Sequence, residues 1–152
     1  MYSLEEFKEI DKYKTKVLKY VLYKKRTKYE ILQKFVKEIP EEIIEDIIED
    51  LEENGYIGDE NYIERAIDEF IAIKTMSLKE IKYKLLSKGI KSNLIEDYFQ
   101  NNRNKLDEYE KMCAIKIVNK KQNDINELEI KNFLIKKGYQ DKSISNAFKK
   151  TE

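Results

Sequence analysis

The chain contains no histidine among its 152 residues, and this absence excludes several kinds of site. Ser-His-Asp and Cys-His catalysis, zinc sites built on imidazole and histidine pH switches all need that side chain. The single cysteine, Cys113, cannot form an internal disulfide or a zinc ribbon, and it fits a reducing compartment. The glycine-rich loops that cradle phosphates are also missing. We therefore expect a protein that is not an enzyme, with no catalytic residues, no cofactor and no bound metal.

Glycine and proline are scarce as well, with four glycines and one proline in the whole chain. Few residues are therefore available for β-hairpin turns, and the composition favours an all-α fold. The apolar runs are only a few residues long, far short of the roughly 20 residues that span a bilayer. The N-terminal residues lack a hydrophobic signal region. We expect a cytoplasmic protein with no membrane partner.

What the chain does contain is a helix-start motif that recurs three times at almost equal spacing. Its copies are Thr27–Ile31, Ser77–Ile81 and Asn126–Ile130, so their first residues lie 50 and 49 positions apart. In each copy a short polar residue is followed three positions later by glutamate, the pattern of a capping box, and then by isoleucine. Gly89 and Gly138 follow the second and third of these helices, as expected at a helix C-terminus.

The recurring motif predicts an elongated or curved array of three tandem three-helix repeats. We expect the repeats at about 12–56, 57–104 and 105–152, within a single domain that covers residues 1–152. A short leader helix is expected before them, around Leu4 to Ile10. Such an array presents a surface rather than a catalytic cleft.

Apolar residues recur on one face of each expected helix and predict the core. In the middle helices these residues are Ile31, Leu32, Phe35, Ile81, Leu85, Leu86, Ile130, Phe133 and Leu134. In the first helices they are Val17, Leu18, Val21, Leu22, Ile63, Ala66, Ile67, Phe70, Met112, Cys113, Ile117 and Val118. The third helices are expected at Glu41 to Asn54, at Ser92 to about Asn102 and at Asp141 to about Lys150.

The residues around the first two repeats fill two patterns that are typical of one protein family. The family pattern L-x-x-x-G-Y-(I/L)-x-D-x-x-(F/Y) is filled from Leu51 by Gly55, Tyr56, Ile57, Asp59 and Tyr62. The pattern I-x-x-x-L-x-x-K-G-I is filled by Ile81, Leu85, Lys88, Gly89 and Ile90. Further matches are Arg26–Ile31 in the first repeat and Lys137–Tyr139 in the third. Together these residues resemble the RecX family, and the resemblance covers about residues 13–149.

This resemblance implies an all-α array that lies in the groove of the RecA recombinase filament and suppresses its ATPase, strand-exchange and coprotease activities. Such a protein modulates DNA repair and recombination and has no catalytic residues. The chain has 30 basic and 30 acidic residues, a balance that favours the protein filament over DNA as the main partner. We expect at most weak contact with DNA inside the filament, and a monomeric protein.

The balanced total hides strongly separated charges. Residues 12–37 contain ten basic residues and one acidic residue, whereas residues 41–69 contain thirteen acidic residues and one basic residue. Because tyrosines are interleaved with the basic residues, we expect the basic middle helices to contact the partner. The candidate partner-binding residues are Lys24, Lys25, Arg26, Lys28, Lys79, Lys82, Lys84, Lys88 and Lys91. The same charges could instead be solvated helix faces that pair with their neighbours.

Two other functions stay open. The stretch from Arg26 to Ile57 is also compatible with a winged-helix transcription regulator that binds DNA. Its supposed recognition helix, however, carries carboxylates that phosphate would repel. These are Glu41, Glu42, Glu45, Asp46, Glu49 and Asp50. The remaining alternative is a generic helical scaffold with another partner.

Overall fold

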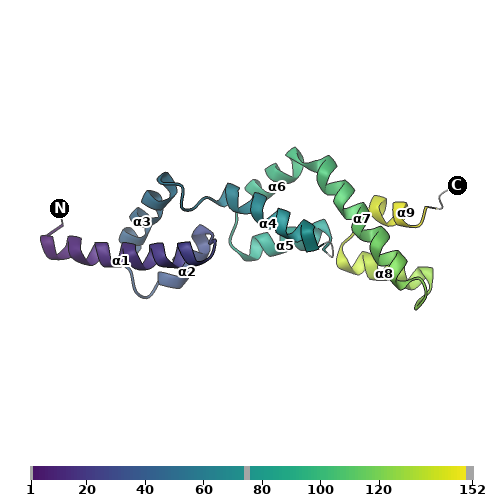
Figure 1. The fold of residues 1–152 in the computed structure, drawn as a ribbon, viewed down its shortest axis with the longest axis horizontal. Helices are drawn as coiled ribbons and strands as arrows, with labels where there is room; N and C mark the ends of the chain where they lie inside the picture. Colours follow the sequence, from purple (N-terminus) through teal and green to yellow (C-terminus); the bar gives the residue numbers. More distant parts are fainter. Residues whose placement is uncertain (1, 74–75, 150–152) are drawn as a thin grey trace. The chain divides into compact units, whose positions relative to one another are not determined.

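The computed structural model describes residues 2–73 and 76–149, which form nine α-helices and no strand (Figure 1). In chain order the helices are α1 (Leu4–Tyr23), α2 (Lys28–Phe35), α3 (Glu41–Glu53), α4 (Asp59–Ile73), α5 (Leu78–Ser87), α6 (Ser92–Asn101), α7 (Arg103–Lys121), α8 (Glu127–Lys137) and α9 (Asp141–Ala147). The all-α prediction is confirmed. The predicted end of the last helix, at Lys150, lies outside the described residues.

The expected separate leader helix is wrong, because Leu4–Tyr23 is one continuous helix. Its N-cap is Ser3, whose Oγ accepts the N–H of Glu6 at 3.2 Å. No glycine or proline separates the expected leader from the residues that follow it. Nothing in the sequence therefore interrupts the backbone hydrogen bonds of α1.

The chain divides into two compact units. The first contains Met1–Ile63 and Lys88–Ile90, and the second contains Glu64–Ser87 and Lys91–Glu152. The first residues of α4 thus belong to the first unit and the rest of α4 to the second. The division into three repeats and their arrangement as an array stay predictions.

The core of the first unit is formed by α1, α2 and α3, with α1 and α2 both packed against α3. Its buried side chains are Val17, Val21, Ile31, Phe35, Ile39, Ile44, Ile47, Ile48, Leu51 and Ile57. Within each helix these residues recur at spacings of three and four positions, so they share one face. Burial of that face supplies the main driving force for folding of this unit.

In the second unit α7 packs against α6, α8 and α9. The buried residues of α7 are Leu106, Tyr109, Glu110, Cys113, Ala114 and Val118. The shorter helices α5 and α8 add Leu78, Ile81, Leu85, Ile130 and Leu134. A charged residue, Glu110, therefore lies in the middle of an otherwise apolar helix face.

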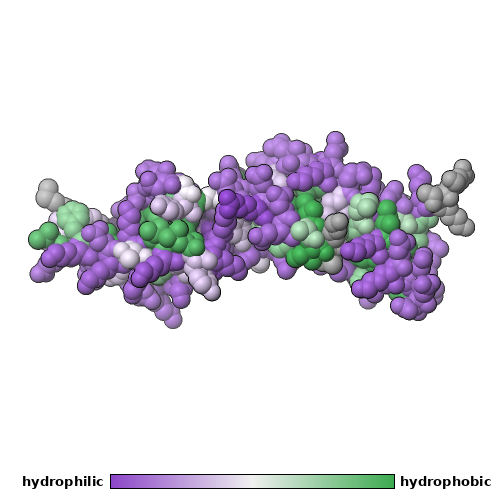
Figure 2. All heavy atoms as spheres, viewed as in Figure 1, coloured by the Kyte–Doolittle hydropathy of each residue, from purple (hydrophilic) through white to green (hydrophobic). Residues whose placement is uncertain are grey.

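Most of the predicted core residues are buried or half-buried, and three of the predictions are wrong. Leu22, Leu86 and Met112 are 64%, 46% and 62% exposed. In each case a neighbouring apolar residue, one position earlier or later, takes the inward position. Apolar side chains therefore reach the surface of the protein, where Figure 2 shows them among hydrophilic neighbours.

Candidate partner-binding surfaces

The start of α2 is held by a capping box that also bonds to a residue far along the chain. The Oγ1 of Thr27 accepts the N–H of Glu30, and the Glu30 carboxylate accepts the N–H of Thr27, both at 3.1 Å. The buried Thr27 hydroxyl donates to the backbone carbonyl of Lys88 at 2.6 Å. The Lys88 ammonium also lies 3.7 Å from the Glu30 carboxylate. These contacts bring the candidate residue Lys88 to the start of α2.

The same bonds recur at the start of α5. The Oγ of Ser77 accepts the N–H of Glu80, and the Glu80 carboxylate accepts the N–H of Ser77, both at 3.1 Å. The Ser77 hydroxyl donates to the carbonyl of Lys137 at 2.6 Å, and Lys137, like the acceptor at α2, precedes a glycine. At the start of α8 the Oδ1 of Asn126 accepts the N–H of Glu129 at 2.9 Å. The predicted starts of these three helices are therefore confirmed.

Glycine is required after both of these lysines. Gly89 and Gly138 have φ angles of 82° and 91°, in the left-handed region where a side chain is strained. A Cβ on Gly89 would lie 2.1 Å from the Tyr29 side chain, and one on Gly138 would lie 2.8 Å from the Cδ of Lys79. The two glycines thus end a helix and also leave room for the residue two positions after each cap.

A buried carboxylate completes the junction at the start of α5. Glu110 is 0% exposed, and its Oε2 accepts the N–H of Leu78 at 2.9 Å. Its Oε1 accepts the backbone N–H of Gln140 at 3.0 Å, the Gln140 side-chain amide at 3.1 Å and the Ser143 hydroxyl at 2.7 Å. These four hydrogen bonds compensate for burial of the carboxylate. Sequence reasoning missed Glu110, because no local pattern separates it from the exposed acids around it.

Two buried tyrosines near this junction stay protonated at neutral pH. Burial raises the pKa of both Tyr109 and Tyr139 well above the ordinary value of 10.0. The Tyr109 hydroxyl donates to the carbonyl of Met76, directly before Ser77, at 2.7 Å. Tyr109 therefore supports the chain that leads into α5.

Lys24 and Lys25 lie directly after α1 and are exposed. Neither forms an ion pair with another described residue. The two preceding residues, Leu22 and Tyr23, are 64% and 86% exposed. We call Leu22–Lys25 the α1 tip. It combines an exposed aromatic side chain with positive charge, which suits contact with another macromolecule.

The next two candidates, Arg26 and Lys28, make contacts within the first unit. The guanidinium carbon of Arg26 lies 4.0 Å from the centre of the Tyr20 ring, a cation–π contact. Lys28 forms an ion pair with Glu52, and its backbone N–H donates to Asp59 at 3.3 Å. These side chains are therefore less available to a partner than those of the α1 tip.

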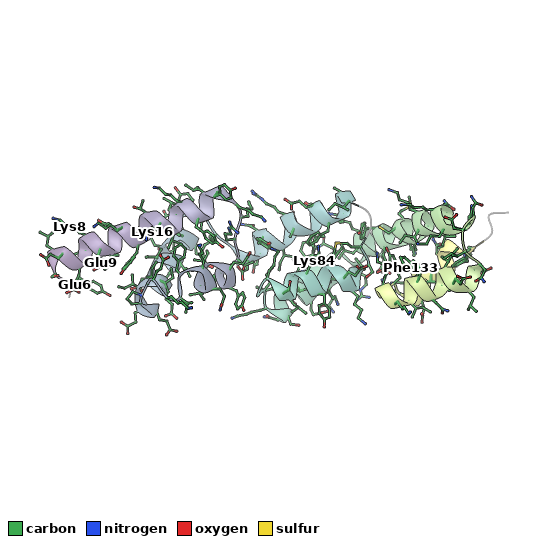
Figure 3. The ribbon with its side chains drawn as sticks, turned by 90° about the horizontal axis from the view of Figure 1, so that it is seen from below. Glu6, Lys8, Glu9, Lys16, Lys84 and Phe133 are labelled. Atoms are coloured by element: carbon green, nitrogen blue, oxygen red, sulfur yellow. The ribbon has the colours of Figure 1, made fainter. Side chains whose placement is uncertain are left out.

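Lys82 and Lys84 on α5 are likewise engaged within the second unit. The Nζ of Lys82 lies 2.8 Å from the Glu96 carboxylate and 4.8 Å from the centre of the Phe99 ring. The Nζ of Lys84, which is labelled in Figure 3, lies 5.5 Å from the centre of the Phe70 ring. Both ammonium groups thus have neighbours in the fold.

Lys79 and Lys91 are exposed, and neither forms an ion pair with another described residue. Lys79, Tyr83 and Leu86 follow one another at spacings of four and three residues, so they share one face of α5. Tyr83 is 72% exposed and Leu86 is 46% exposed. We call these three residues the α5 face. The sequence pattern predicts Leu86 in the core, and this wrong prediction hides the part of Leu86 in the α5 face.

Several features of other protein classes are missing from the described chain. Residues 2–73 and 76–149 contain no group of three or more Cys, Asp or Glu side chains that could hold a metal ion. None of the described helices has the length and apolar character needed to cross a bilayer. After Ile57 the chain forms α4, so the described residues lack the β-hairpin of a winged-helix protein.

The fold and its surfaces define an all-α protein with recurring helix junctions and two exposed, partly basic surfaces. No protein-family model matches the chain, and no curated protein sequence matches it. Among solved structures, RecX from Lactobacillus salivarius is similar with a TM-score of 0.78 and 30% sequence identity, over 92% of this chain and 94% of that one. A crystal structure of regulatory protein RecX is similar with a TM-score of 0.75 and 22% identity, over 95% of this chain and 78% of that one. The chain belongs to the RecX family.

Proposed function

We propose that this RecX-family regulatory protein binds the filament of the RecA recombinase and inhibits its ATPase, strand-exchange and coprotease activities. It would thereby modulate DNA repair and recombination. Family membership carries the proposal, because the similarity to RecX from Lactobacillus salivarius extends over 92% of the chain. The RecX resemblance of the sequence implies the same partner and the same effects.

The α1 tip and the α5 face support a protein partner. Each combines an exposed tyrosine with a lysine that forms no ion pair with a described residue. Tyrosine supplies a large contact area at a low cost in side-chain entropy, and lysine steers an acidic surface toward it. We therefore assign partner contacts to Lys24, Lys25 and Lys79. We add Lys91, which lies outside both surfaces but is likewise exposed and forms no ion pair with a described residue. The remaining candidates, which contact carboxylates or aromatic rings, are assigned to stabilising the fold.

In this proposal the protein inhibits the filament by remaining bound to it. A protein that is bound across neighbouring filament subunits blocks the relative motion that couples ATP turnover to subunit exchange. The chain supplies no chemical step. Its effect should therefore saturate when all binding positions on the filament are filled.

Co-sedimentation with pre-formed RecA filaments, with and without DNA, tests binding, and DNA-dependent ATP hydrolysis tests inhibition. We expect slower ATP turnover at saturating protein, and unchanged turnover would contradict the proposal. The double variant Lys24→Glu/Lys25→Glu should bind about tenfold more weakly, because it reverses two steering charges. The matched variant Lys120→Glu/Lys136→Glu makes the same charge change at exposed lysines outside both surfaces. It should bind within about twofold of the unchanged protein.

A further inference from the structure

A small cavity opens in the second unit at the beginning of the α5 face. Its volume is about 280 Å³, and residues of α5, α6, α7 and the turn after α8 line it. Leu78, Phe99 and Leu106 are buried and give it an apolar floor, while Lys79 and Arg103 are exposed at its rim. Small-molecule sites usually measure roughly 300–1,000 Å³. The cavity therefore suits one or two side chains of a partner better than a nucleotide.

Both carboxylates in the wall of the cavity are already bonded within the fold. Glu110 accepts the four hydrogen bonds described above. Asp107 accepts hydrogen bonds from Lys142 at 2.5 Å and from the Gln140 side chain at 3.2 Å. Burial raises the pKa of Asp107, but the hydrogen bonds from Lys142 and Gln140, together with the positive charges of Lys142 and Arg103, outweigh burial, so the pKa lies below its ordinary value. The charge of Arg103 thus acts on Asp107, but neither acid forms an ion pair with Lys79 or Arg103 at the rim.

Two of the cations around the cavity form no ion pair with a carboxylate of the described residues. Lys82 is held by Glu96, whereas Lys79 and Arg103 form no ion pair with any residue in the described part of the chain. The methylene stem of Lys79 packs against Gly138, which restricts the positions of its ammonium group. A charge that is already positioned loses less entropy when it binds an anion.

We propose that this cavity docks a glutamate or aspartate side chain, flanked by apolar residues, from an acidic segment of a protein partner. Lys79 and Arg103 bind the carboxylate, and the apolar floor takes the methylene groups. The flanking apolar residues contact Tyr83 and Leu86 farther along the α5 face. A phosphate dianion is disfavoured, because two carboxylates line the same wall. That the partner is the RecA filament rests on the proposed function, whereas the preference for a carboxylate does not.

The first experiment titrates the ¹⁵N-labelled full chain with the blocked tripeptide Leu-Glu-Leu. The backbone amide signals of Gly138 and Gln140, at the cavity wall, should shift and saturate in the millimolar range. The shifts should be lost in Lys79→Gln/Arg103→Gln and kept in the matched variant Lys120→Gln/Lys136→Gln. The proposal is overturned if the glutamate peptide gives no shift, if Leu-Gln-Leu shifts the signals equally or if the cavity variant responds like the control. Stronger shifts with a short single-stranded DNA would also overturn it, in favour of phosphate.

The second experiment compares the same two variants in co-sedimentation with RecA filaments. Binding by Lys79→Gln/Arg103→Gln that is about tenfold weaker than by the control variant would support docking of the partner at the cavity. If the unchanged protein binds and both variants bind equally well, the docking role is overturned and the proposed function stands. If the unchanged protein fails to bind filaments but responds to the glutamate peptide, the proposed function fails and the carboxylate site stands.

Discussion

Replacing Glu110 with alanine should strongly destabilise the second unit. Four hydrogen bonds of 2.7–3.1 Å end on this fully buried carboxylate. Two of the donors, the Leu78 N–H and the Ser143 hydroxyl, belong to buried residues and would lose their acceptor. Gln140 is half-buried, so its donors can form hydrogen bonds with water instead. Each buried donor that is left without an acceptor costs about 1–3 kcal/mol, so we expect the free energy of unfolding to fall by roughly 3–5 kcal/mol.

Urea unfolding followed by far-UV circular dichroism measures this loss, and hydrogen exchange at the Leu78 amide assigns it to the junction. Asp59→Ala is the matched control, because Asp59 accepts the N–H of Lys28 at the start of α2. That single bond is 3.3 Å long and Asp59 is half-buried, so the expected loss is about 0.5–1 kcal/mol. Equal losses in the two variants, or a loss below about 1 kcal/mol for Glu110→Ala, would refute the reasoning.

Three further predictions test the capping contacts, the glycine turns and the ionised wall of the cavity. Ser77→Ala should lower the free energy of unfolding by about 2 kcal/mol in urea, because the buried hydroxyl both caps α5 and donates to a distant carbonyl. Ser3→Ala removes only an exposed cap and should cost about 0.5–1 kcal/mol, and equal costs would contradict the role of the distant bond. Gly55→Ala should cost about 1 kcal/mol for its φ of 79°, since a Cβ there meets no atom within 4 Å. Gly138→Ala should cost at least about 1 kcal/mol more in the same assay, because its Cβ also meets the Lys79 side chain. Equal costs for the two variants would contradict this, since they would mean that the Lys79 side chain moves aside at little cost. The pKa of Asp107 is lowered in the fold from its ordinary value of 3.8, so its ionised form adds stability above that pH and loses it as pH falls through the folded pKa. Asp107→Asn should therefore flatten the fall in stability below about pH 4 in acid titrations, and an unchanged slope would contradict this.

The helix boundaries could be predicted because their causes are local in sequence. Thr27 and Ser77 bond to glutamates three positions away, and Gly138 takes the left-handed conformation directly after α8. Such signals need no knowledge of the rest of the fold. The prediction of a separate leader helix was wrong because it lacked such a signal. No residue between Ile10 and Lys12 is of a type that ends a helix.

The long-range contacts could not be predicted in this way. The acceptor of the Thr27 hydroxyl is a backbone carbonyl 61 residues away, and any residue could supply one. Glu110 looks like the exposed Glu108 in sequence, and only the packing of α7 separates a buried acid from a solvated one. The candidate lysines illustrate the same limit. Composition predicted a basic surface, but only the contacts distinguish Lys79, which forms no ion pair with a described residue, from Lys82, which is paired.

The bond from Thr27 to Lys88 also constrains how the protein can be made and divided. The first unit needs Lys88–Ile90, which the ribosome delivers only after α5 has been synthesised. A fragment cut between α4 and α5 would leave the Thr27 hydroxyl without its acceptor and Tyr29 without the glycine it packs against. The N-terminal part of the chain thus completes its own contacts only when residue 90 has emerged, and α1, α2 and α3 cannot be separated from Lys88–Ile90 without losing these contacts.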